Sequence, residues 1–421
     1  MLDIKFVREN QKEVEKMLEK RGMKLNLGHL LEIDDVRLKL IKEVESMRRE
    51  RKDAASKHDE EKGRDVKKIL SKKEDALDAV KREFKTKLLE IPNIVHDDVP
   101  VGAETANKVL KKVGEPPKFG FNPKDHVEIG MALDIIDIPR AAKVAGSRFY
   151  YLKNDAVLLE LALIDFALKS LIKEGFIPIL PPALLKKHIT EGLGYWQAGG
   201  NENFYTVSDF DIGGPERGKP LPLYLIGTGE HAIVPMHSDE ILSENELPKR
   251  YAAFSPNFRR EAGSYGKDTH GILRVHQFNK VEMVSFVKPE DDKKEREKLL
   301  SLAEHFVKEL ELPYQVVQLV SGDLAFPSAA TTDIETWIPS QNKYRETHSI
   351  STTTDFQSRR LNIKYKKGNN SQFTHILNAT AIAMPRIMIA IIENHQQKDG
   401  SVKLPKVLHE YMGKDTLQGS K

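Results

Sequence analysis

The sequence contains no cysteine among its 421 residues. A disulfide framework, a thiolate-ligated zinc site and a cysteine nucleophile are therefore excluded. The H-E-x-x-H zinc motif and the strict G-x-G-x-x-G dinucleotide fingerprint are absent as well. The chemistry of this chain must rest on other residue types.

No stretch of the sequence has the character of a secretory signal or a membrane span. The first residues, MLDIKFVRENQ, include an acid at Asp3 and no apolar run. The most apolar stretch, Ile376 to Ile392, contains Asn378, Pro385 and Arg386, so we expect it to be buried in a protein core. We therefore expect a cytoplasmic protein without membrane contact.

Charge of one sign is in only small excess over the whole chain. The 66 lysine and arginine residues and the 63 aspartate and glutamate residues give a formal net charge of +3. Residues 35–90 contain 18 basic and 14 acidic side chains, a net of +4, which leaves −1 for the rest of the chain. A basic segment of this kind can follow nucleic-acid phosphates. A solvated coiled-coil face with i,i+4 ion pairs is the alternative.

This basic segment lies within a long helical pattern from about Ile33 to Ile91. Apolar or small side chains recur there in steps of three and four, which is the spacing of a seam between two packed helices. Gly63 lies in the polar middle of the pattern and is expected to mark the tip of a helical hairpin. Pro92 is expected to end the second helix.

The length predicts two or three domains. The residue pattern changes after the hairpin. Three prolines and two glycines lie between Gly114 and Pro123, which we interpret as a linker. We expect an N-terminal domain over residues 1–113 and a second domain over residues 114–421. The second domain contains expected helices over 158–172, 289–311 and 382–394. Its short strands do not alternate regularly with these helices, which predicts an α+β domain with an antiparallel sheet.

One segment comes close to a phosphate-binding loop. Residues Gly213 to Lys219 read G-G-P-E-R-G-K, but Pro220 follows where a Ser or Thr hydroxyl is needed for magnesium. Proline also fits poorly with the helix that such a loop must open. We interpret the segment as a surface turn.

The run from Asn257 to Met283 predicts a β-hairpin with a long Gly-rich loop. Arg259 offers a planar fork to a phosphate or carboxylate. Glu261 is expected on the same strand face because side chains alternate with a period of two, and Glu282 on the returning strand could join them. A surface ladder of salt bridges is an equally open interpretation of these charges.

Three runs of the sequence resemble the motifs of class II aminoacyl-tRNA synthetases. The run from Phe258 to Glu261, with its returning strand, is similar to motif 2. The helix and strand that end at Pro181-Pro182 resemble motif 1, the dimer-forming element. The run from Leu377 to Arg386, continuing to Asn394, resembles motif 3.

Four further stretches resemble the seryl-tRNA synthetase family more narrowly. They are the long basic hairpin, the run from Leu225 to Glu230, the sequence HQFNKVEM, and the run from Asp333 to Arg360. The resemblance covers essentially the whole chain in the right order. It implies an N-terminal antiparallel coiled-coil hairpin followed by a class II synthetase domain whose antiparallel sheet is flanked by helices.

The resemblance also implies an activity and its partners. The family activates L-serine with ATP to seryl-adenylate and then transfers serine to the 3′ end of tRNA(Ser). Magnesium is expected to accompany ATP. No zinc is expected, since the divergent zinc-dependent form of the enzyme uses a cysteine ligand. A homodimer is implied, with the hairpin reaching for the long variable arm of the tRNA, whose shape and phosphates it would bind.

The resemblance assigns roles to individual side chains. Those implied to be catalytic are Arg259, Glu261 and Arg386. Those implied to bind serine are Thr228, Gly229, Glu230, Glu282 and Thr380. Those implied to bind ATP are Arg259, Arg260, Glu261, Val275, Phe278, Glu346, Thr347, His348, Ser349 and Arg386. Glu346 and Ser349 are also implied to hold magnesium, which prefers hard oxygen ligands.

The sequence departs from the family pattern at two places, and two other functions are possible alternatives. Ala379-Thr380-Ala381 stands where many members have Gly-Ser-Gly, and Gly229 stands where Ala or Ser is usual, which predicts a slightly looser turn. One rival is an amino-acid ligase that charges a carrier protein, but such relatives lack the tRNA-binding arm. The other is a non-catalytic RNA-binding paralogue, which should have lost Arg259, Glu282 or Arg386.

Overall fold

The computed structural model describes residues 1–196, 200–207, 222–262 and 270–419, so the predicted turn at Gly213 to Lys219 lies outside the described residues. The chain divides into two compact units, Met1–Ile94 and Val95–Lys421. This division comes earlier than the boundary predicted between residues 113 and 114. The reason is that β1 (Lys108–Val113) pairs antiparallel with β11 (Tyr314–Gln318) and so belongs to the sheet of the second unit.

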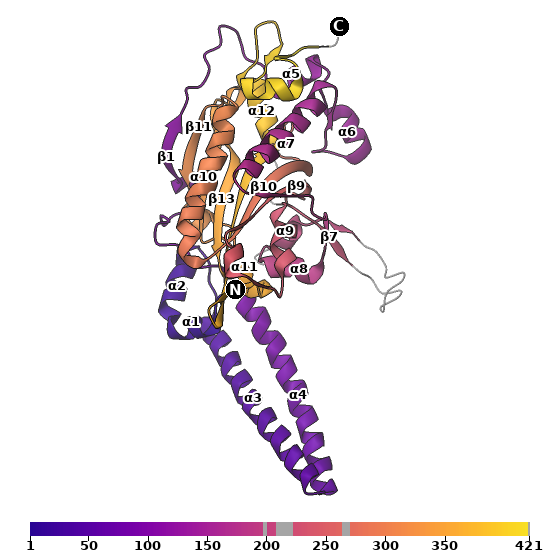
Figure 1. Ribbon diagram of the computed structural model, residues 1–421, viewed down its shortest axis with the longest axis vertical. Coiled ribbons are helices and arrows are strands. Elements are labelled where there is room, and N and C mark those ends of the chain that lie inside the picture. The colour runs from indigo at the N-terminus through magenta and orange to yellow at the C-terminus, as the bar shows by residue number, and fades with distance from the viewer. Residues whose placement is uncertain (197–199, 208–221, 263–269, 420–421) are drawn as a thin grey trace. The chain divides into compact units, whose positions relative to one another are not determined.

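The first unit consists of two short helices and a long antiparallel helical hairpin (Figure 1). The helices are α1 (Ile4–Glu9), α2 (Gln11–Lys20), α3 (Leu27–Ser56) and α4 (Glu60–Leu89). The Asn26 side chain accepts a hydrogen bond from the His29 amide at the start of α3, and the Asp59 side chain accepts one from Lys62 at the start of α4.

The tip of the hairpin lies earlier than the sequence predicted. The chain reverses at residues 57–59, where His58 adopts a left-handed backbone with φ of 55°. Gly63 lies in the first turn of α4 and is not the turn residue. The three-residue connection is capped by Asp59, so the reversal does not need the conformational freedom of glycine.

The seam of the hairpin is apolar, as the spacing predicted. Val44 of α3 is buried with Leu70 and Leu77 of α4. Ion pairs cross the exposed edges of the seam, among them Arg48–Glu74 at 2.7 Å. Exposed pairs of this kind contribute little to stability, so the buried seam is what holds α3 against α4.

The second unit is built on an eight-stranded sheet with the order β1-β11-β12-β13-β16-β10-β9-β4. The strands not yet given are β4 (Ile177–Ile179), β9 (Lys249–Phe258), β10 (Gln277–Val287), β12 (Ala330–Ile338), β13 (Lys343–Thr354) and β16 (His375–Ala383). Every pairing is antiparallel except that of β4 with β9. The predicted α+β class with a mostly antiparallel sheet is therefore confirmed.

The remaining elements of the second unit surround this sheet (Figure 1). The helices are α5 (His126–Ala132), α6 (Ile138–Ala145), α7 (Asp155–Lys173), α8 (Lys187–Leu193), α9 (Glu230–Ile233), α10 (Asp292–Glu309), α11 (Phe356–Leu361), α12 (Met384–Asn394) and α13 (His409–Met412). The smaller sheets contain β2 (Ile136–Asp137), β3 (Tyr151–Leu152), β5 (Leu184–Lys186), β6 (Thr206–Val207), β7 (Leu223–Leu225), β8 (Ile241–Leu242), β14 (Lys364–Lys367), β15 (Asn370–Phe373), β17 (Val402–Lys403) and β18 (Thr416–Leu417). The helices predicted over 158–172, 289–311 and 382–394 correspond to α7, α10 and α12.

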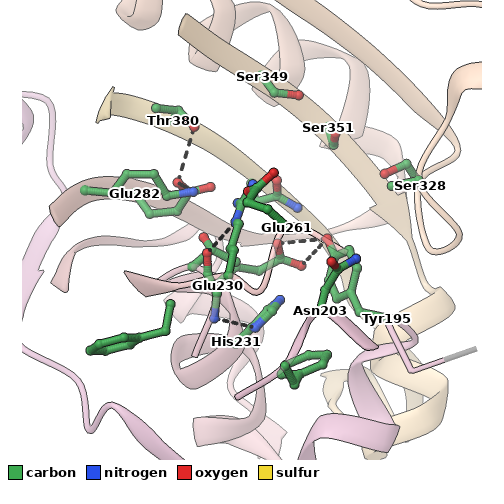
Figure 2. A pocket seen from close by; sticks show the side chains of 18 of the residues that line it. Tyr195, Asn203, Glu230, His231, Glu261, Glu282, Ser328, Ser349, Ser351 and Thr380 are labelled. Atoms are coloured by element: carbon green, nitrogen blue, oxygen red, sulfur yellow. Dashed lines mark hydrogen bonds and ion pairs between the residues drawn. The ribbon is translucent and has the colours of Figure 1, made fainter. Parts of the chain in front are cut away.

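The two faces of the central strands differ in chemistry because side chains alternate along a strand. On β10, Lys280 and Glu282 line a polar cavity, and Glu282 lies there opposite Thr380 of β16 (Figure 2). Val281 and Met283, which alternate with them along the strand, enter the hydrophobic core on the other face. One strand thus supplies both the core and the wall of the cavity.

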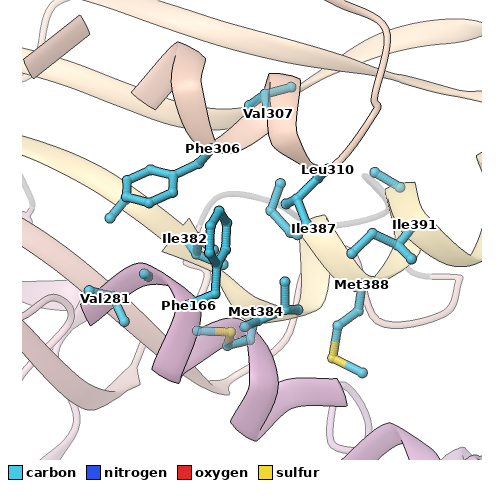
Figure 3. Packing of buried hydrophobic residues seen from close by; sticks show 14 of the residues in the cluster. Phe166, Val281, Phe306, Val307, Leu310, Ile382, Met384, Ile387, Met388 and Ile391 are labelled. Carbon is cyan, nitrogen blue, oxygen red and sulfur yellow. The ribbon is translucent and has the colours of Figure 1, made fainter. Parts of the chain in front are cut away.

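The core lies between the sheet and the helices α7, α10 and α12 (Figure 3). Phe166 of α7 packs edge-to-face on Phe306 of α10, with ring centroids 5.6 Å apart. Ile387 and Met388 of α12 are completely buried in the same cluster. Packing at this density fixes the strands that carry the cavity residues.

The apolar stretch from Ile376 to Ile392 forms most of β16 and α12 and is almost entirely buried, as predicted. Across the described parts of the chain, no helix combines the length and apolar character needed to cross a membrane.

Candidate active site

A cavity of about 610 Å³ opens on the polar face of β10, β13 and β16. Residues after β7 and β9 complete its wall, including Thr228, Glu230 and Arg259. A second, smaller cavity shares Arg259, Glu261 and Glu346 with it and extends to Phe278 and Arg386. The two spaces form one site with an inner and an outer end. Below, the end near Glu230 and Glu282 is called the inner end, and that near Arg386 the outer end.

A buried ion pair forms one wall of the inner end. The Lys280 Nζ lies 2.6 Å from the Glu282 Oε2, and both side chains are at most 6% exposed. Two residues apart on β10, they point to the same face. The Thr380 hydroxyl donates to the same Glu282 oxygen at 3.5 Å (Figure 2). The charge of Glu282 is therefore already balanced within the protein.

Glu230 forms another part of the wall, and its hydrogen-bond donors among the described residues are neutral. The Tyr195 hydroxyl lies 3.1 and 3.0 Å from its two carboxylate oxygens, and the Gln357 amide donates to Oε1 at 2.7 Å. Burial, which outweighs these hydrogen bonds, raises the pKa of the Glu230 carboxyl to about 7. This group favours a cationic ligand, because such a ligand would stabilise its ionised form.

His231, next in sequence, keeps a neutral ring beneath this wall. Its Nδ1 accepts a hydrogen bond from the Gly227 amide at 3.2 Å, and its ring stacks on Phe204. Burial, together with the charges of Arg259 and Lys280, lowers the pKa of His231 to about 3. The histidine is therefore a packing and hydrogen-bonding group and does not carry charge at neutral pH.

Two polar atoms at the inner end lack a partner within the described structure. They are the Thr228 Oγ1 and the Asn378 Nδ2, both on residues that are at most 8% exposed. Leaving such groups unsatisfied costs about 1–3 kcal/mol each. A small ligand that offers both hydrogen-bond donors and acceptors would remove this cost.

The outer end is cationic and partly aromatic. Arg259 follows the last residue of β9, and its Nε donates to the Gly227 carbonyl at 3.0 Å. Its guanidinium lies 5.5 Å from the centre of the Phe278 ring. Arg386, at the start of α12, contacts the Glu346 carboxylate at 3.1 Å and its carbonyl oxygen at 2.9 Å. Arg274 also lines both cavities. These guanidinium groups and the aromatic ring suit a nucleotide with its phosphates.

Glu346 and Ser349 both line the cavity although they are three residues apart on β13. An uninterrupted strand would place them on opposite faces. The pairing of β12 with β13 shifts register between Ile334 and Glu335, and this bulge brings Glu346 to the side of Ser349. Desolvation raises the pKa of the Glu346 carboxyl, whereas the charges of Arg386 and Arg259 lower it. The net shift is below the usual value.

These oxygens fit a hard cation that is shared with a ligand. Among the described residues, no group of three or more His, Cys, Asp or Glu side chains could hold a metal ion unaided. A carboxylate and a hydroxyl side by side supply only part of a magnesium shell, and phosphate oxygens commonly supply more. Opposite Ser349, on β12, the buried Asp333 has an oxygen, Oδ1, without a hydrogen-bond partner in the described structure.

The structure brings most of the predicted site residues together. Those that line one or both cavities are Thr228, Glu230, Arg259, Glu261, Val275, Phe278, Glu282, Glu346, Thr347, Ser349, Thr380 and Arg386. Glu261 does so differently from the prediction. It lies beyond the end of β9, with a left-handed backbone at φ of 52°, and does not share a strand face with Arg259.

Three predicted residues do not line either cavity. The Arg260 amide donates to the Asn203 carbonyl, and its side chain is exposed. His348 is buried, and its ring nitrogens contact the Thr347 hydroxyl at 2.9 Å and the Ala381 carbonyl at 3.0 Å. Gly229 lines neither cavity, and the turn that contains it is tightly packed and not loose as predicted.

The tight packing of Gly229 has a simple geometric cause. A Cβ atom at this position would lie 2.9 Å from the Ala253 Cβ and 3.4 Å from the Glu282 Cβ. Glycine therefore lets the segment that carries Thr228 and Glu230 approach β9 and β10 closely.

Several residues of the site were not predicted from the sequence. Lys280 stands two positions before Glu282, and strand periodicity alone could have placed both on one face. Asn378 lies in the run from Leu377 to Arg386, from which Thr380 was predicted as a serine-binding residue but Asn378 was not. Tyr195 and Gln357 come from distant segments and have no local sequence signal.

Two family models match the chain. The family model described as the seryl-tRNA synthetase N-terminal domain matches residues 1–95. The model described as the class II tRNA synthetase core domain (G, H, P, S and T) matches residues 216–395.

Curated relatives match over nearly the whole chain. A serine--tRNA ligase of Thermodesulfovibrio yellowstonii is 42% identical, covering 99% of this chain and 100% of the relative. A serine--tRNA ligase of Nitrosopumilus maritimus is 40% identical, covering 98% of this chain and 99% of the relative. Among solved structures, seryl-tRNA synthetase from Pyrococcus horikoshii complexed with ATP matches with a TM-score of 0.90 and 38% identity, covering all of both chains.

Proposed function

The chain belongs to the seryl-tRNA synthetase family, and from this premise we propose that it activates L-serine with ATP and transfers the serine to tRNA(Ser). The observation that carries the proposal is the division of the site. As far as the described residues show, the inner end has one carboxylate without a counter-charge, that of Glu230, and two polar atoms without a hydrogen-bond partner. The outer end has the guanidinium groups of Arg259, Arg274 and Arg386 beside an aromatic ring.

The inner end fits the groups of a small hydroxyamino acid. In the described part of the chain the donors to Glu230 are neutral, so this carboxylate would take the ammonium group. Glu282 is neutralised by Lys280, so it would accept a hydrogen bond from a neutral hydroxyl, with Thr380 beside it. Alanine has no hydroxyl to donate to Glu282, and the loss of this hydrogen bond in a buried site penalises its binding by a few kcal/mol.

Activation at this site needs no side-chain nucleophile. A serine carboxylate oxygen attacks the α-phosphorus of ATP, an O–P bond forms, and the bond from that phosphorus to the bridging oxygen breaks, releasing pyrophosphate. We assign Arg259 to the α-phosphate and the substrate carboxylate, Phe278 to the adenine ring, and Arg386 to the γ-phosphate. Fixed guanidinium groups that stabilise the developing charge account for catalysis by positioning and electrostatics.

Glu346 and Ser349 would hold the magnesium ion that accompanies ATP, because their oxygens fit the preference of that cation. When bound, the ion neutralises phosphate charge. The net lowering of the Glu346 pKa keeps this carboxylate ionised for that role.

We assign tRNA binding to the first unit and catalysis to the second. The basic hairpin of α3 and α4 supports the first assignment. We also propose a cytoplasmic homodimer. Val157, Leu158 and Leu161 of α7 are each more than 40% exposed, and Leu180, just after β4, is 77% exposed. An apolar surface of this kind suits burial against a second copy.

The test is pyrophosphate exchange with a panel of amino acids, followed by aminoacylation of tRNA(Ser). We expect exchange with serine, strong discrimination against alanine and threonine, and subsequent transfer to tRNA. Exchange with serine but transfer only to a carrier protein would replace the proposal with the ligase alternative. No exchange with serine would refute it.

A further inference from the structure

Glu230 is held from two sides by residues that no strand of the central sheet carries. The Gln357 amide, from α11, donates to its Oε1 at 2.7 Å. The Tyr195 hydroxyl, from the segment after α8, reaches both of its oxygens (Figure 2). A carboxylate with hydrogen bonds from two sides has a fixed plane, so the direction of its lone pairs into the cavity is fixed too.

The two donors are themselves fixed in one connected network. The Gln357 Oε1 accepts from the Thr353 hydroxyl at 3.2 Å, and its amide also donates to the Leu193 carbonyl at 3.2 Å. Arg360, also in α11, donates to the carbonyls of Glu191 and Gly192. Helix α11 therefore holds the end of α8.

Tyr195 follows directly from that end. The helix is closed by Gly194, whose backbone is left-handed with φ of 89° and whose missing Cβ would lie 2.8 Å from the Phe356 ring. The backbone direction after α8 is thus fixed, and it places the Tyr195 hydroxyl in contact with the Glu230 carboxylate. The tyrosine ring lies 5.0 Å from the His231 ring, which restricts its rotation.

Resting on the serine-activating function proposed above, we propose that Tyr195 and Gln357 are positioning residues which hold the Glu230 carboxylate oriented and ionised for the ammonium group of the amino-acid substrate. They act through Glu230 and do not contact the reacting atoms. Their neutral donors stabilise the carboxylate without cancelling the charge that the ammonium group needs. A lysine or arginine at either place would form an ion pair and compete with the ligand.

Near neutral pH, Glu230 is expected to change its charge while the groups that face it do not. Lys280 and Glu282 of β10 form a neutralised pair. Arg259 is a guanidinium and stays charged. His231 has a pKa of about 3, and burial raises the pKa of Tyr195 well above its usual value. Since burial places the pKa of Glu230 at about 7, serine affinity should rise with pH through 7.

The test is the pH profile of serine KM in pyrophosphate exchange for Tyr195→Phe. The variant loses one hydrogen bond to the ionised carboxylate, which raises the pKa of Glu230. We expect serine KM to rise about tenfold below pH 7 and to return to within about threefold of the wild type at pH 9, with ATP KM unchanged. Gln357→Met should shift the profile in the same direction.

The matched control is Tyr251→Phe. Tyr251 is also a buried tyrosine, but its hydroxyl contacts His237 at 2.9 Å outside the cavity. This variant should leave the profile in place. If Tyr195→Phe left the serine profile unmoved, or raised serine and ATP KM equally at every pH, the positioning role would be refuted. A wild type without serine-dependent exchange would instead refute the proposed function itself.

Discussion

Lys280 and Glu282 form an ion pair at 2.6 Å in the wall of the cavity, and both side chains are almost completely buried. Burial lowers the pKa of the Lys280 ammonium, while the charge of Glu282 raises it, and the net shift is downward. The pair places a carboxylate in the site without leaving a net charge there. Removing one partner would leave the other charge buried and uncompensated.

This pair makes a prediction about stability. Lys280→Met should lower the free energy of unfolding by about 3–5 kcal/mol, because Glu282 loses its counter-charge. The double variant Lys280→Met with Glu282→Met should recover most of that loss. Urea unfolding of all four proteins in a double-mutant cycle measures the coupling. As a control, Lys169→Ala removes the exposed pair with Asp165 and should change the free energy of unfolding far less than Lys280→Met does.

A second prediction concerns two adjacent arginines. Arg259→Ala should lower the rate of serine-dependent pyrophosphate exchange by at least about a hundredfold, because the transition state loses a fixed cation. Arg260→Ala should remain within about threefold of the wild type, since that side chain lies outside both cavities. Exchange within about tenfold of the wild type for Arg259→Ala would contradict the assigned role.

A third prediction follows from the packing of Gly229. Gly229→Ala places a Cβ 2.9 Å from the Ala253 Cβ and must displace the segment that carries Glu230. We expect serine KM to rise by about tenfold, equivalent to about 1.4 kcal/mol, with little change in ATP KM. Adding Ala253→Gly should restore much of the serine affinity. Failure of the second change to help would show that the contact is not the cause.

The fourth prediction uses His348, whose pKa burial lowers to about 4. In the unfolded chain a histidine titrates near 6.5, so the unfolded state binds the proton first as pH falls. The wild type should therefore lose about 2–3 kcal/mol more stability than His348→Gln between pH 7.5 and pH 4.5. Urea unfolding at both pH values measures the difference. Equal losses for the wild type and His348→Gln would contradict the prediction.

The hairpin supplies the fifth prediction. Lys67, Lys68 and Lys72 are exposed on α4. Changing all three to glutamine should raise the KM for tRNA at least about fivefold and flatten its salt dependence, because phosphate contacts are lost. Serine-dependent exchange should not change. The same substitutions at Lys5, Lys12 and Lys16, exposed in α1 and α2, serve as the control.

Much of the fold could be predicted because its signals are local. The steps of three and four along α3 and α4 specify a packed seam, and the apolar run from Ile376 to Ile392 specifies buried elements. The tip of the hairpin was predicted at Gly63, but it lies at residues 57–59, because the Asp59 side chain caps α4 and no glycine is needed there. The start of the second unit was also misplaced, because β1 pairs with a strand about 200 residues away and leaves little local trace.

By itself, the sequence determined the family resemblance, the basic hairpin and most of the residue types that the site requires, because each depends on order and spacing along the chain. Only the tertiary structure decided how those residues meet. A bulge between β12 and β13 places Glu346 beside Ser349 against strand alternation. Tyr195 and Gln357, 162 positions apart in the printed sequence, converge on Glu230 through the packing of α8 and α11. Such contacts are fixed by close packing and by the need of buried polar groups for partners, and neither is written in local periodicity.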